Sequence, residues 1–376
     1  MITEIVPVDS QSLTHLKQQW GRWVLITSVV WVGLGLLISL SGQELWVYFL
    51  TSAPVLFWQF GRLWKFLPFN RTKPQEPLRY GFGAANWITL IRGSMFAFLA
   101  GFVLLPKFEN WLAWLPAGLY LTAVLLDYID GAVARLTHTT SILGEKLDMD
   151  MDGLGILIAT LVALNMGQVP LVFLLVGLAR YLFLIGIWIR KQKHLPVYDL
   201  PLRRFRRGLA GAQMGFLAVV LFPIFNPPAT YISAYFFLTP FVLFFLLDFL
   251  AVSGWSTEKK SHIWVEFKNW VFVLRFLLAS VGLVLLLLFP TRPLFQLILF
   301  SACILLVLTG TAARIAALGL MLFAGFALRV NPLDPWQWAL LLLSLMVFWL
   351  GSGRFSIWQP ENFILYQRIG AAPDEG

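Results

Sequence analysis

Long apolar segments separated by short polar ones run along almost the whole chain. The first two, 23–41 and 46–62, are joined by the short turn SGQE. Each has about 17–20 residues, enough for a helix to cross roughly 30 Å of hydrocarbon. Six more segments follow up to residue 252, and four lie beyond residue 268. The pattern predicts an all-α polytopic membrane protein of about 12 spans.

The spans fall into three blocks. Residues 1–79 hold two spans, residues 80–252 form a six-helix core, and residues 253–376 hold four more spans. We expect the core spans at 88–106, 111–135, 146–166, 168–189, 208–225 and 230–252, and the last four at 269–289, 293–310, 312–328 and 336–351. The C-terminal block has no acidic residue in its spans. It is expected to pack against the core, to form a lipid surface or to build a homodimer.

The N-terminal block also contains two charged stretches. Residues 10–22 place apolar and basic side chains on opposite sides of a helix, which indicates either an interfacial helix or an extension of the first span. Residues 62–85 are rich in Pro and Gly and are expected to form a basic cytoplasmic loop, with Arg62, Lys65, Arg71, Lys73 and Arg79.

The charge pattern favours a membrane setting over nucleic-acid binding. The net charge is +9, yet 59% of the residues are hydrophobic and only 12% are charged. Basic loops and anionic lipid headgroups explain such a balance. Counting spans from a cytoplasmic N-terminus places every basic loop and both termini in the cytoplasm. We expect a bacterial-type plasma membrane protein. The single cysteine, Cys303, excludes an intrachain disulfide.

Chemistry is concentrated in one stretch, DYIDGAVARLTHTTSILGEKLDMDMD, residues 127–152. On a helix, Asp127, Asp130, Gly131 and Arg135 share one face. A second helix beginning near Gly144 places Gly144, Asp148 and Asp152 on one face. Two facing helices joined by a polar turn thus bring four carboxylates together, whereas Asp150 lies about 200° round the second helix.

Four carboxylates in a membrane protein require compensation. Hard divalent cations prefer oxygen ligands, and Mg²⁺ often combines carboxylates with substrate phosphates. A pair of such ions suits displacement at phosphorus. The alternatives are a solvated acidic cluster at helix ends and an intramembrane cation transporter. A transporter predicts acidic residues spread across the membrane depth, whereas here they gather at one face.

The stretch resembles the signature of the CDP-alcohol phosphotransferases, D-x-x-D-G-x-x-A-R-x8-G-x3-D-x3-D. Every position is filled, by Asp127, Asp130, Gly131, Ala134, Arg135, Gly144, Asp148 and Asp152. The resemblance covers about residues 80–252. It implies a six-helix membrane enzyme with two Mg²⁺ or Mn²⁺ ions, which transfers a phosphatidyl or phospho-alcohol group from a CDP-linked donor to an alcohol and releases CMP.

The resemblance also implies residue roles. Asp127, Asp130, Asp148 and Asp152 would hold the metals, and Asp152 would also take the proton of the acceptor hydroxyl. Gly131, Ala134, Arg135 and Gly144 would contact the nucleotide. Asn86, Thr89 and Arg92, in the run NWITLIR, match an Asn-x-x-Thr-x-x-Arg-like element that faces the nucleotide in the family. The alternative for these three is helix capping, with Arg92 extended toward the interface.

Basic residues downstream bear on the acceptor. Arg180 lies in the middle of an apolar run, where it is expected to face a polar cavity and pair with a carboxylate or an anionic substrate. The cluster Arg203, Arg204, Arg206 and Arg207 suits either lipid headgroups or a phosphate on the acceptor. The following GLAGAQM is similar to a Gly-Lys-x-x-Thr-x-x-Gln-Met region of phosphatidylglycerophosphate synthases, although Arg207 and Ala210 replace the Lys and Thr.

Two substrate pairs remain open at this point. The first is CDP-diacylglycerol with a polar alcohol such as glycerol 3-phosphate or an inositol-type polyol. The second is a soluble CDP-aminoalcohol with diacylglycerol as acceptor. The basic cluster favours the first pair, because a phosphorylated acceptor needs cations and diacylglycerol does not.

Overall fold

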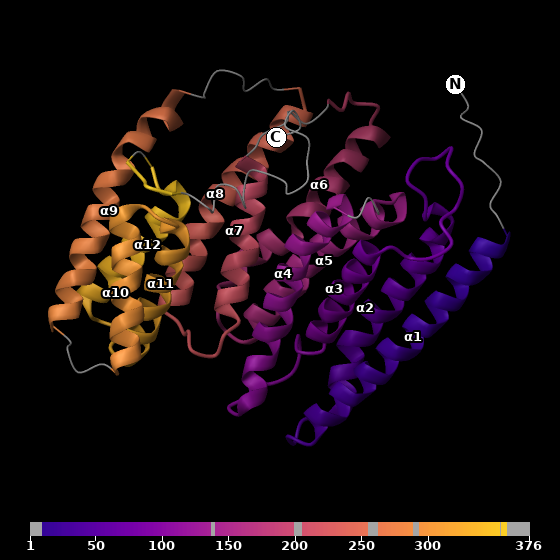
Figure 1. Ribbon diagram of the computed structural model, residues 1–376, viewed down its shortest axis with the longest axis horizontal. Coiled ribbons are helices and arrows are strands. Elements are labelled where there is room, and N and C mark those ends of the chain that lie inside the picture. The colour runs from indigo at the N-terminus through magenta and orange to yellow at the C-terminus, as the bar shows by residue number, and fades with distance from the viewer. Residues whose placement is uncertain are drawn as a thin grey trace. The chain divides into compact units, whose positions relative to one another are not determined.

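The structure is a computed structural model that describes residues 10–136, 140–198, 205–254, 262–288, 293–353 and 355–358. Within these residues it contains twelve α-helices and three short 3-10 helices, and no strand (Figure 1). Among the described residues, five stretches are long and apolar enough to cross a membrane: 10–39, 111–131, 171–192, 229–252 and 271–288. The protein is therefore an all-α polytopic membrane protein, as the sequence pattern predicts.

The helices follow one another with short connections. The α-helices are α1 (Ser10–Ser39), α2 (Leu45–Phe66), α3 (Ala84–Ala100), α4 (Leu115–Leu136), α5 (Ile142–Asn165), α6 (Leu174–Gln192), α7 (Phe205–Val220), α8 (Ala229–Val252), α9 (His262–Leu288), α10 (Leu294–Thr309), α11 (Ala313–Val330) and α12 (Pro335–Leu350). The 3-10 helices are η1 (Leu67–Phe69), η2 (Trp111–Trp114) and η3 (Leu171–Phe173). The expected core spans overlap α3 to α8 and the last four overlap α9 to α12, with several ends displaced by a turn or more.

The chain divides into two compact units. Among the described residues, one unit contains those up to Leu182 together with Ala212–Pro223, and the other contains those of Phe183–Gly211 and those from Ile224 onward. The first unit holds the N-terminal helices and the acidic stretch. The second unit holds α8 and the C-terminal helices.

The N-terminal helices decide between two alternatives at one place and differ from expectation at another. Residues 10–39 form one continuous helix, so the amphipathic stretch extends the first apolar segment. The loop expected to begin at Arg62 begins later, because α2 continues to Phe66 and is followed by η1. In the extra turn, Leu63 and Phe66 continue the helical spacing of Leu56 and Phe60 and are buried like them, which explains why the helix goes on.

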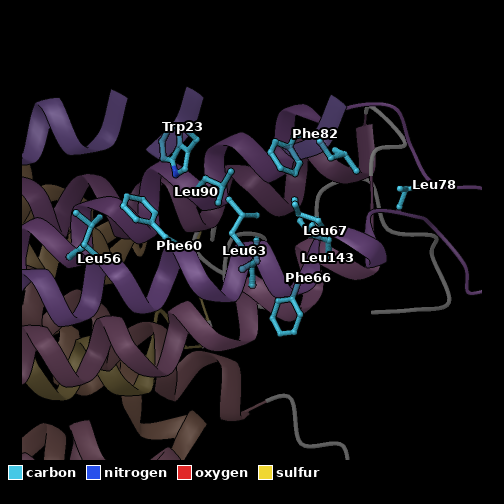
Figure 2. Packing of buried hydrophobic residues seen from close by; sticks show 13 residues of the cluster. Trp23, Leu56, Phe60, Leu63, Phe66, Leu67, Leu78, Phe82, Leu90 and Leu143 are labelled. Carbon is cyan, nitrogen blue, oxygen red and sulfur yellow. The ribbon is translucent and has the colours of Figure 1, made fainter. Parts of the chain in front are cut away.

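One apolar core joins the N-terminal helices to the helices that carry the acidic stretch. Figure 2 shows side chains of this core converging from several helices. The members come from α1, α2, η1, the loop before α3, and helices α3 and α5: Leu16, Trp23, Leu56, Phe60, Leu63, Phe66, Leu67, Leu78, Phe82, Leu90, Ala97, Leu143 and Leu147. The N-terminal extension is thus packed into the same core as α3 and α5.

In the second unit, the four C-terminal helices form a ring. Helix α9 packs on α10 and α12, and α11 packs on the same two helices. Arg275 of α9 is buried among them and donates hydrogen bonds to three main-chain carbonyls. Nε reaches Val307 at 2.9 Å, Nη2 reaches Leu308 at 2.7 Å and Nη1 reaches Ser352 at 2.6 Å. Two of these carbonyls belong to the last turn of α10, where main-chain carbonyls have no partner within the helix. One guanidinium therefore supplies their hydrogen bonds inside an apolar bundle.

Replacing Arg275 by Met should destabilise this bundle, because three buried carbonyl groups lose their donor. We expect the midpoint of thermal unfolding in detergent to fall by roughly 5–10 °C. Ser280→Ala on the exposed side of the same helix is the matched control and should leave the midpoint within about 1 °C. Equal midpoints for Arg275→Met and the control would contradict the role assigned to the guanidinium.

Candidate catalytic centre

The acidic side chains lie on two helices that face a third. Asp127 and Asp130 are near the C-terminal end of α4, and Asp148 and Asp152 are in the first half of α5. Both helices pack against α3. The three- and four-residue spacings place each pair on one helix face. The four carboxylates converge, as their spacing predicts, but they do so on α3, which was not expected from the sequence.

The point of convergence is Arg92 of α3. Its Nη1 pairs with Asp127 and lies 3.2 Å from Oδ2 of Asp130. Its Nη2 lies 2.5 Å from Oδ1 of Asp148 and 3.2 Å from Oδ1 of Asp152. The Arg92 side chain is fully buried, so the guanidinium forms the floor of the acidic cluster.

The four carboxylates differ in their access to solvent. Asp130 is only 9% exposed and also accepts a hydrogen bond from Thr89 Oγ1 at 3.2 Å. The other three side chains are 32–44% exposed. Asp127, Asp148 and Asp152 each direct one carboxylate oxygen into a group whose members all lie within 4.8 Å of one another. The cluster is therefore closed to solvent around Arg92 and Asp130 and open on the side of the other three carboxylates.

The charge of this cluster suits a divalent cation. Four carboxylates and one guanidinium leave a net charge of −3. Repulsion between carboxylates at such short range is costly away from bulk water. Closely spaced oxygen donors are the ligands that Mg²⁺ and Mn²⁺ prefer. The donor set fits the metals that the sequence predicts, with Asp127, Asp148 and Asp152 on the accessible side.

A chain of hydrogen bonds fixes the start of α5 beside α3. Asn86 of α3 donates from Nδ2 to Asn70 Oδ1 at 3.1 Å and accepts from Ser141 Oγ at 3.1 Å. The Ser141 hydroxyl in turn accepts from the Gly144 main-chain N–H at 3.0 Å and caps the helix. Asn70 also donates to the carbonyl of Gly81 at 3.0 Å. The loop after α2 therefore sets the position of the helix that carries Asp148 and Asp152.

Comparison with known proteins identifies the domain that contains this centre. Residues 82–247 match the family model described as CDP-alcohol phosphatidyltransferase. This segment belongs to the CDP-alcohol phosphatidyltransferase family. No curated protein and no solved structure matched the chain. The chain thus carries a transferase domain of phospholipid synthesis, with all four carboxylates and Arg92 inside it.

The other predicted site residues lie in or beside helices α3, α4 and α5, or outside the described part of the structure. The side chains of Asn86 and Thr89 are buried and engaged in the contacts described above. A Cβ at Gly144 would lie 2.7 Å from Asn86 Oδ1, so glycine permits close approach of the two helices here. Gly131 follows Asp130 on α4. The predictions for Ala134, Arg135, Arg203, Arg204, Arg206 and Arg207 concern side chains outside the described part of the structure.

Two further predictions concern Asp150 and Arg180. Asp150, expected to point elsewhere, pairs with Arg62 of α2 on another side of α5. Arg180 lines a cavity with both of these residues. Arg180 makes no salt bridge with any carboxylate that the structure describes.

Three features were missed by sequence reasoning. Arg92 was expected to face the nucleotide, and its contact with all four carboxylates was not foreseen. Asn70 and Arg62 were placed in a loop without a role. A signal existed for Arg92, since it lies three residues after Thr89 and six after Asn86 on one helix face. Asn70 and Arg62 carry no comparable signal, because their partners are distant in sequence.

Replacing Arg92 by Met should make folding depend on divalent cations. Without the guanidinium, four carboxylates remain close together with no compensating charge. We expect the thermal midpoint in EDTA to fall by several degrees, and the rise on adding Mg²⁺ to exceed that of the wild type. Arg92→Lys retains the positive charge but lacks the forked donors of arginine. Its Mg²⁺-induced rise in thermal midpoint should therefore lie between those of the wild type and Arg92→Met. Identical Mg²⁺-induced shifts in all three proteins would exclude Arg92 as the compensating charge.

Proposed function

We propose that the protein transfers the phosphatidyl group of CDP-diacylglycerol to a polar alcohol and releases CMP. Phosphatidyl transfer from a CDP-alcohol follows from the family. The observation that carries the proposal is the convergence of four carboxylates on Arg92 within that domain. With the divalent cations that its oxygen donors suit, such a centre fits a reaction in which negative charge on a pyrophosphate must be held and redistributed.

The chain's own residues supply binding and proton transfer. The acceptor hydroxyl oxygen forms a bond to the phosphorus attached to diacylglycerol, the bond from this phosphorus to the bridging oxygen breaks, and CMP leaves. A carboxylate oxygen of Asp152, which is 41% exposed, accepts the hydroxyl proton. Arg92 holds all four carboxylates in place throughout. Two divalent metals, held by Asp127, Asp130, Asp148 and Asp152, would neutralise the pyrophosphate and the departing CMP.

The remaining predicted residues are assigned to the substrates. We propose Gly131, Ala134, Arg135 and Gly144 for the nucleotide, with Asn86 and Thr89 positioning the helices around it. Arg180 and the cluster of Arg203, Arg204, Arg206 and Arg207 are proposed to bind a phosphate of the acceptor or of a lipid headgroup. Forked guanidinium groups suit this task. The centre is proposed to open to the cytoplasm, where soluble alcohols and CMP are available.

The most informative experiment supplies purified protein with CDP-diacylglycerol and a panel of alcohols. The panel contains glycerol 3-phosphate, myo-inositol, inositol phosphate, serine and glycerol, and CMP and the lipid product are both measured. We expect CMP release that depends on one class of alcohol. Release of CMP from CDP-choline or CDP-ethanolamine with diacylglycerol, and none from CDP-diacylglycerol, would replace the donor assignment by the alternative one.

The metal requirement gives a second prediction. EDTA should abolish turnover, and Mg²⁺ or Mn²⁺ should restore it. Asp127→Asn and Asp148→Asn should each lower kcat by at least about 100-fold, because electrostatic stabilisation of the transferring group is the main catalytic contribution. Glu145→Gln removes one exposed negative charge from the same helix and serves as the control. A loss at Glu145 equal to that at Asp148 would show that overall charge, and not the cluster, governs turnover.

A further inference from the structure

A second charged site lies next to the catalytic centre. A cavity of about 320 Å³ is lined by Arg62 and Phe66 of α2, by Lys146, Met149 and Asp150 of α5, and by Arg180 of α6. Three cations and one carboxylate give its lining a net charge of +2. This sign is opposite to that of the acidic cluster, and a lining with a net positive charge attracts anions more than metal ions.

The two cations at one side of this cavity are held by aromatic rings. Arg62 lies over Phe66 at 4.5 Å from the ring centroid, and Lys146 lies 5.4 Å from the same ring and 4.0 Å from that of Phe69. Arg62 also donates from Nε to Asp150 Oδ2 at 2.8 Å. Its side chain remains 30% exposed, and that of Asp150 19%. Both cations are therefore positioned while their polar ends remain accessible.

The third cation, Arg180, connects the cavity to the catalytic centre. It lies in the middle of the apolar stretch 171–192 and packs on α5 at Gly153, where a Cβ would collide with its side chain. Arg180 is close enough to Asp152 to interact with it electrostatically. A ligand bound by Arg180 would therefore lie beside the carboxylate assigned to proton transfer.

We propose that this cavity binds a phosphate group through Arg62, Lys146 and Arg180, and that Arg62 is a specificity-determining residue supplied from outside the family domain. A phosphate ester carries a charge of about −1.5 to −2 near pH 7, which matches the lining. Arginine forks bind phosphate oxygens in pairs. Asp150 holds Arg62 in place and offsets part of the positive charge. The assignment of this phosphate to a substrate rests on the proposed function, but phosphate binding itself does not.

Binding of inorganic phosphate to the full-length protein in a neutral detergent tests the proposal. Phosphate binding is measured by isothermal titration calorimetry in the presence of EDTA and without a CDP-linked donor. Neither metal binding nor turnover then contributes to the measured heat. We expect saturable binding by the wild type. Arg62→Gln lowers the cavity charge to +1 and should weaken binding at least about 10-fold. Asp150→Asn raises the cavity charge to +3 and should strengthen phosphate binding.

The opposite directions of these two changes separate binding from structure. Both variants break the same Arg62–Asp150 pair, so a merely structural role would shift phosphate affinity in one direction for both. Lys65→Gln, which removes one exposed positive charge a turn away on α2, should leave affinity unchanged. Absence of saturable binding by the wild type, or weaker binding in both Arg62→Gln and Asp150→Asn, would overturn the proposal.

Competition distinguishes the two sources of phosphate. Displacement by glycerol 3-phosphate, with no displacement by phosphatidate in mixed micelles, assigns the cavity to a soluble acceptor. The reverse result assigns it to a lipid headgroup, and both results support a phosphate site. A protein that releases CMP from CDP-diacylglycerol but binds no phosphate would contradict this proposal and retain the proposed function. A protein that binds phosphate but never releases CMP would support the phosphate site and contradict the proposed function.

Discussion

Compensation of negative charge in an apolar helix bundle is the constraint on which this structure depends. Arg92 meets it with one fully buried guanidinium that contacts all four carboxylates. Removing either side of such an arrangement leaves uncompensated charge, which is expensive where water is scarce. Helices α3, α4 and α5 must therefore pack closely around this point. The remaining net charge of −3 lies toward the open side, where three of the carboxylates could hold a metal ion.

The N-terminal extension completes the region around this centre. Its apolar side chains share a core with α3 and α5, and Asn70 reaches through Asn86 to the start of α5. Arg62 approaches α5 from another side and pairs with Asp150. Helix α5 is thus held between two charged environments of opposite sign. The family domain at residues 82–247 contains the carboxylates, while residues before it position them and contribute to the cavity.

Much of this arrangement could be predicted from the sequence, because it depends on local periodicity. Apolar runs of the right length gave the helices of the core and of the C-terminal block. The spacing of Asp148 and Asp152 placed them on one face and Asp150 on another. Contacts between distant segments could not be predicted in this way. The end of α2 depended on burial of Leu63 and Phe66 against other helices, and the partners of Arg62 and Arg275 lie 88 and at least 32 residues away.

The fate of each phosphorus atom tests the central claim most directly. CDP-diacylglycerol is labelled with ³²P only at the phosphorus bonded to diacylglycerol and is supplied to the purified protein with the accepted alcohol and Mg²⁺. If the carboxylate centre transfers a phosphatidyl group, the label should appear entirely in the new phospholipid, and the CMP should be unlabelled. Label recovered in the nucleotide product, or only in phosphatidate when alcohol is abundant, would contradict the account.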